Sequence, residues 1–66
     1  MFNQSETDKL RFLLKKFLAL KNIEHDDEKF ESTLKNLANI IYSTGGDLSE
    51  ETVNKYLQAL FDRGLV

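Results

Sequence analysis

The 66-residue sequence contains no cysteine and no proline. Without cysteine there can be no disulfide bonds and no thiolate-ligated metal sites, and nothing points to an oxidising compartment. Without proline, no helix is obliged to break, and a proline-rich linker is excluded. The length predicts a single domain over residues 1–66. Its stability should be modest, because so short a chain buries only about 60% of the surface that its unfolded form exposes.

Long apolar runs are also missing. No run approaches the ~20 apolar residues that a membrane-spanning helix needs. The segment from Met1 to Glu6 lacks the basic and then apolar pattern of a signal peptide. We therefore expect a cytoplasmic protein without a membrane partner. The hydrophobic fraction of 41%, with five phenylalanines and two tyrosines, indicates a compact core rather than disorder.

Groups that could perform chemistry are scarce. His25 is the only histidine and is flanked by three acidic residues. Because zinc sites usually take three or four ligands at fixed spacing, we interpret this stretch as a solvated loop. Gly45-Gly46 is not followed by the Gly-Lys-Ser/Thr of a phosphate-binding loop. No nucleophile, base and orienting group can be grouped, so we expect no enzymatic activity, cofactor, metal or small-molecule substrate.

Apolar residues recur at steps of three and four, which predicts amphipathic helices. The first helix is expected at about residues 6–21, where Ser5-Glu6-Thr7-Asp8 offers a hydroxyl cap and an acidic first turn. Its apolar stripe consists of Leu10, Leu13, Leu14, Phe17 and Leu18. Phe12 and Ala19 lie seven residues apart and off this stripe. They predict a second contact face, which either packs against a neighbouring helix or is offered to a partner. This face is also our candidate surface for self-association.

Two further helices are expected at about residues 27–43 and 50–63. Asp26 or Asp27 would cap the former, and Ser49 would cap the latter, with acids in the first turn. Glycines follow both helices, as is common at helix ends. Ser32-Thr33 could restart the earlier of these two helices and split it in two. The sequence therefore predicts an all-α, compact bundle of three helices, or of four if that split occurs.

Charge is unevenly distributed along the chain. Residues 1–21 hold five basic and two acidic residues, whereas residues 22–66 hold four basic and nine acidic residues. An anion should therefore prefer the first helix. Its candidates for non-specific phosphate contacts are Lys9, Arg11, Lys15 and Lys16. The alternative is that these charges belong to an ordinary solvated helix face.

The C-terminal half contains a turn, a helix cap and an apolar stripe in succession. Its residues are Leu48-Ser49, Thr52-Val53, Tyr56-Leu57, Leu60 and Gly64-Leu65-Val66. This pattern resembles the later part of a winged helix-turn-helix. With Leu37-Ala38-Asn39, Ser43 and Gly45, the stretch 37–66 is similar to the winged-helix segment that follows the ATPase domain in a family of prokaryotic AAA-type ATPases.

The resemblance implies a helix-turn-helix whose recognition helix lies at residues 50–63. The sequence holds no ATPase domain, so no nucleotide chemistry is implied. In the winged-helix pattern, the wing would begin at the position of Val66. The wing is therefore expected to be absent or vestigial. The connection between the second and third helices is longer than the turn of classical helix-turn-helix repressors.

The exposed positions of that recognition helix would be Glu50, Glu51, Asn54, Lys55 and Gln58. Asn54 and Gln58 could read adenine edges, and Lys55 could meet a guanine or a phosphate. Glu50 and Glu51 would approach phosphates with the wrong charge, and the pI of about 5.2 is not that of a basic DNA-binding domain.

Three functions remain open at this point. One is a DNA-binding transcription regulator that acts through the third helix, with a homodimer to double its weak phosphate footprint. Another is a protein-binding adaptor or inhibitor that uses an apolar patch formed around Phe2, Phe12, Ala19, Ile23 or Phe61. In the third, the segment only positions other domains, as in a relative of a larger ATPase.

Overall fold

The computed structural model describes residues 2–66 and contains three helices in that range. These are α1 (Gln4–Leu20), α2 (Asp27–Ser43) and α3 (Glu50–Asp62), and no strand occurs in the described part of the chain. The all-α, three-helix class predicted from the sequence is confirmed. Ser32 and Thr33 lie inside the continuous helix α2, so the split that would create a fourth helix does not occur.

The start of α1 corrects the sequence-based expectation. Asn3 is the N-cap, and its side chain accepts a hydrogen bond of 2.9 Å from the backbone N–H of Glu6. The carboxylate of Glu6 accepts a hydrogen bond of 3.0 Å from the backbone N–H of Asn3, which completes a capping box. The helix therefore begins at Gln4, and Ser5 lies in its first turn instead of capping it.

The other helix starts are also capped by side chains. Asp26 accepts a 2.7 Å hydrogen bond from the backbone N–H of Lys29, and Ser49 accepts a 3.3 Å bond from that of Thr52. Beyond α2, Gly45 has a φ of 118°, which an L-residue rarely adopts. Local chemistry thus sets where each helix begins and where α2 must end.

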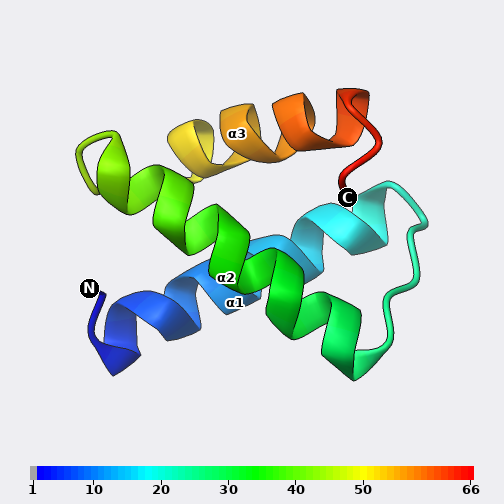
Figure 1. Ribbon diagram of the computed structural model, residues 1–66, viewed down its shortest axis with the longest axis horizontal. Coiled ribbons are helices and arrows are strands. Elements are labelled where there is room, and N and C mark those ends of the chain that lie inside the picture. The colour runs from blue at the N-terminus through cyan, green and yellow to red at the C-terminus, as the bar shows by residue number, and fades with distance from the viewer. Residues whose placement is uncertain (1) are drawn as a thin grey trace.

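One core joins all three helices. Its ten buried side chains are Leu10, Leu13, Leu14, Phe17, Leu18, Leu34, Leu37, Ile41, Val53 and Leu57. Half of them come from α1, which packs against both other helices. In Figure 1, α2 crosses α1 and α3 lies along one side of the crossed pair. The face of α1 opposite its leucine stripe is consequently covered by neither helix.

No helix in residues 2–66 has the length and apolar character needed to cross a membrane.

Candidate functional site

The outer face of α3 carries the residues that the winged-helix resemblance assigns to recognition. Asn54 and Lys55 are exposed, as is Glu51. Gln58 is only partly exposed, and its Nε2 donates a 2.9 Å hydrogen bond to Oδ1 of Asp62 one turn later. Of the proposed base-reading side chains, Asn54 and Lys55 are therefore open to a partner, whereas the amide group of Gln58 is held along its own helix.

The N-terminus of α3 is occupied by acidic side chains. Asp47 accepts hydrogen bonds from the backbone N–H of Ser49 at 3.0 Å and from Oγ1 of Thr52 at 2.7 Å. The bond from the backbone of Ser49 and the bond from Thr52 lower the pKa of the Asp47 carboxyl, and Lys9 adds a smaller effect in the same direction. A phosphate approaching this helix end would meet carboxylates where anion-binding helices offer free N–H groups.

The cations of α1 are divided between its two neighbours. Arg11 forms a two-pronged ion pair with Glu31 of α2, in which Nη2 lies 3.3 Å from Oε1. On the opposite edge of α1, Nζ of Lys16 lies 2.9 Å from Oε2 of Glu50 at the start of α3. Two of the cations that the sequence places on this helix thus face acidic groups of α2 and α3.

Aromatic rings lie near two further cations, Lys15 in α1 and Lys21 directly after its last residue. The Lys15 ammonium lies 5.9 Å from the centre of the Phe30 ring, which Arg11 also approaches at 6.0 Å. The Lys21 ammonium lies 5.2 Å from the centre of the Phe61 ring at the other end of the helix. These distances are within the range of cation–π attraction. Sequence reasoning missed all of these partners, because they belong to other helices.

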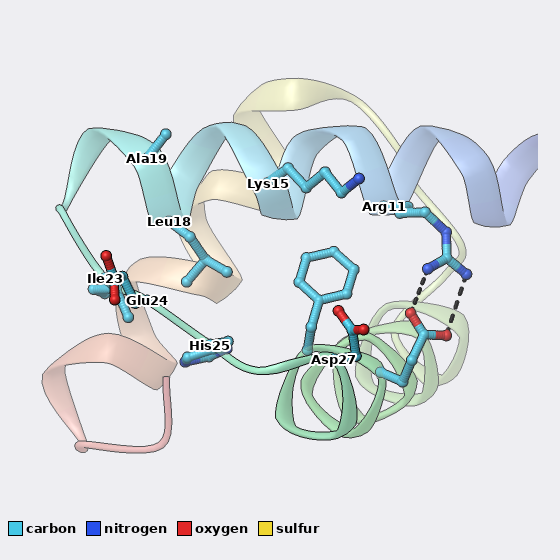
Figure 2. A pocket seen from close by; sticks show the side chains of 10 residues that line it. Arg11, Lys15, Leu18, Ala19, Ile23, Glu24, His25 and Asp27 are labelled. Atoms are coloured by element: carbon cyan, nitrogen blue, oxygen red, sulfur yellow. Dashed lines mark hydrogen bonds and ion pairs between the residues drawn. The ribbon is translucent and has the colours of Figure 1, made fainter.

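An open groove lies between the second half of α1 and the start of α2. Leu18, Ile23 and Phe30 give it apolar walls, and the Arg11–Glu31 pair stands at one end (Figure 2). The groove is lined by Arg11, Lys15, Leu18, Ala19, Ile23, Glu24, His25, Asp27, Phe30 and Glu31. Its rim mixes both signs of charge, so the groove by itself favours neither an anion nor a cation.

His25 is less solvated than the sequence indicates. Its side chain is partly buried at this groove, and Nδ1 is buried without a hydrogen-bond partner among the described residues. Burial lowers the pKa of the imidazole, Lys29 lowers it further, and Asp26 acts in the opposite direction. Within residues 2–66, no group of three or more His, Asp or Glu side chains could hold a metal ion.

Exposed apolar side chains define another surface. Phe12 is 60% exposed, and Ala19, two turns further along α1, is exposed as well. Phe2 and Ile23, which sequence reasoning placed in the same apolar patch, are partly buried and pack against the core. Phe61 contacts the ring of Phe17 edge-on, with 6.2 Å between the ring centres. Of that expected patch, Phe12 and Ala19 on α1 are open, and Phe61 is exposed to 36% beside its contact with Phe17.

Comparison with known proteins gives no match to a family model, a characterised protein or a solved structure.

Proposed function

We propose that this protein is a non-enzymatic helical module that binds another protein through the outer face of α1. The observation that carries the proposal is the 60% exposure of Phe12 at the middle of a 17-residue helix whose opposite face holds half of the core. Aromatic side chains dominate the energy of protein interfaces, because they bury a large area at a low cost in side-chain entropy.

The lysines beside Phe12 support this use of the surface. The ammonium of Lys16 is drawn toward Glu50 on α3, and that of Lys15 toward Phe30 on α2. Both charged ends therefore lean away from the middle of the outer face, where their aliphatic stems remain. Such stems cover apolar surface and can pack against a partner. The surface around Phe12 is consequently more apolar than the sequence of α1 indicates.

A photoreactive phenylalanine analogue at position 12 tests the proposal. We expect irradiation in an extract of the source cells to join the protein covalently to a defined partner. Tyr42 on α2 supplies a matched control, because it is aromatic and 56% exposed. The same analogue at position 42 should give little product. Equal yields at the two positions, or no product from position 12, would contradict the proposal.

DNA binding is a second candidate, which the exposure of Asn54 and Lys55 on α3 favours. It draws on the winged-helix resemblance, although residues 44–49 form a longer connection than the three or four residues usual in a helix-turn-helix. The carboxylates at the start of α3 oppose it.

Fluorescence anisotropy with mixed-sequence duplex DNA at about 50 and 200 mM salt separates the two functions. We expect no binding at either salt concentration. Binding that weakens steeply with salt, and is lost in Lys55→Glu, would establish DNA as the ligand.

A further inference from the structure

We propose that the partner of the α1 outer face is a second copy of this chain, with the two α1 helices antiparallel about a two-fold axis beside Phe12. This inference rests on the proposed function and names the partner. It follows from the spacing of the exposed residues along α1, from the charges beside them, and from the acidic groups of α3 beside Lys9 and Lys16.

The uncovered side chains form a line that is symmetric about its centre. Ser5, Phe12 and Ala19 are all exposed and are spaced seven residues apart, which is about two turns of an α-helix. When two such helices run antiparallel about Phe12, the two Phe12 rings meet at the axis. Ser5 of each copy then lies opposite Ala19 of the other. Two small residues at each end let the helices approach closely enough for the rings to pack.

Charges on one edge of this line are complementary between copies. Asp8 and Lys15 lie on the same side of the line, at similar distances before and after Phe12. In an antiparallel pair related by two-fold symmetry, like edges face each other. Asp8 of each copy therefore faces Lys15 of the other, and the attraction occurs twice. Both side chains are exposed. In the dimer the Lys15 ammonium gives up its place beside the Phe30 ring, 5.9 Å from the ring centre, for the carboxylate of Asp8 of the other copy.

The opposite edge of α1 is protected from like-charge repulsion by α3. There the dimer brings Lys9 of one copy toward Lys16 of the other. Lys16 is already ion-paired with Glu50 at 2.9 Å, and Lys9 is close enough to Asp47 to act on that carboxyl. The acids at the start of α3 thus offset the cations on this edge within each copy.

The size of the contact sets its strength. A helix of 17 residues is about 25 Å long. A contact formed by one helix face from each copy is smaller than the roughly 1,200 Å² that stable complexes bury. We therefore expect a weak dimer that dissociates on dilution, with a dissociation constant on the order of 100 µM.

Sedimentation velocity between about 10 µM and 1 mM protein tests the dimer. The average mass should rise with concentration for the unaltered protein. It should stay that of a monomer for Phe12→Ser, while Tyr42→Ser behaves as the unaltered protein. A monomer at every concentration would overturn the inference, as would loss of the dimer in Tyr42→Ser alone.

A charge exchange identifies the antiparallel arrangement. Asp8→Lys and Lys15→Asp each place like charges opposite each other in the dimer, so each variant alone should remain monomeric. An equimolar mixture should regain dimers, because both cross-copy pairs are then of opposite charge. Helical circular dichroism confirms that each variant is folded. A mixture that stays monomeric would exclude this arrangement.

The photo-crosslinking experiment separates failure of this inference from failure of the proposed function. A product of twice the monomer mass from purified protein with the analogue at position 12 supports both. If the product from cell extract contains only a different protein, the proposed protein-binding function stands, and the inference that the partner is a second copy is overturned. No product from either source overturns both.

Discussion

The imidazole of His25 is partly buried at the groove between α1 and α2, and its Nδ1 has no hydrogen-bond partner in the described part of the chain. Burial disfavours the charged form and is the main reason that the pKa lies below its ordinary value of 6.5, with Lys29 adding to the effect. Asp26 opposes both. The imidazole consequently binds a proton less tightly in the folded protein than in the unfolded chain.

This pKa shift predicts a pH-dependent loss of stability. Because the folded pKa is the lower one, the contribution of the neutral imidazole is fully present above about pH 6.5 and is lost as the pH falls toward the folded pKa. The free energy of unfolding by urea should therefore decrease from about pH 7.5 to pH 5.5. In His25→Gln the decrease should be smaller. An NMR titration of His25 that gives a midpoint above its ordinary value would contradict this prediction.

At the scale of the helices, polar side chains accept hydrogen bonds from the backbone N–H groups of each N-terminus and decide where the helix begins. The capping box of Asn3 and Glu6 starts α1 earlier than the hydroxyl of Ser5 would. Asn3 and Ser5 are both of residue types that favour the N-cap position. The pair Asn3 and Glu6 has the three-residue spacing that lets two side chains satisfy two backbone donors, and this spacing favours the earlier start.

Two alanine substitutions distinguish these caps. Asn3→Ala should lower the free energy of unfolding by about 1 kcal/mol, because it leaves the N–H of Glu6 without its acceptor. Ser5→Ala should change it by less than about 0.5 kcal/mol, because Ser5 lies within the first turn and is exposed. Urea denaturation followed by circular dichroism measures both. A larger loss from Ser5→Ala would show that α1 starts later.

At the scale of the whole molecule, opposite charges attract across the bundle. The basic helix α1 pairs with α2 through Arg11 and Glu31 and with α3 through Lys16 and Glu50. Such exposed pairs are weak and are screened by salt. In both pairs the cation belongs to α1 and the carboxylate to another helix. The basic helix α1 and the acidic remainder of the chain therefore attract each other.

Added salt should therefore destabilise the protein. We expect the melting temperature to fall by a few degrees between about 0.05 and 0.5 M NaCl, measured at protein concentrations below about 20 µM so that the monomer dominates. In the double variant Lys16→Gln with Glu50→Gln, the fall should be smaller. A melting temperature that rises with NaCl would show that repulsion among the acidic groups outweighs these pairs.

Much of this protein follows from local physics that the sequence alone displays. Leucines spaced three and four residues apart determine which face of α1 is buried. Capping side chains such as Ser49 and Asp26 determine where helices begin, and Gly45 determines where α2 ends. These interactions join residues a few positions apart, so the all-helical class and the three helices could be predicted. Even the correction at Asn3 concerns a local capping motif that the sequence contains.

The candidate surfaces depend on contacts that only the tertiary structure decides. Arg11 meets Glu31 and Lys16 meets Glu50 across 20 and 34 residues of chain. Helical periodicity places a side chain on a face but does not say which helix covers that face. For this reason the sequence could not show that the cations of α1 are drawn to its two edges, that His25 is partly buried, or that Phe12 is left on an uncovered surface.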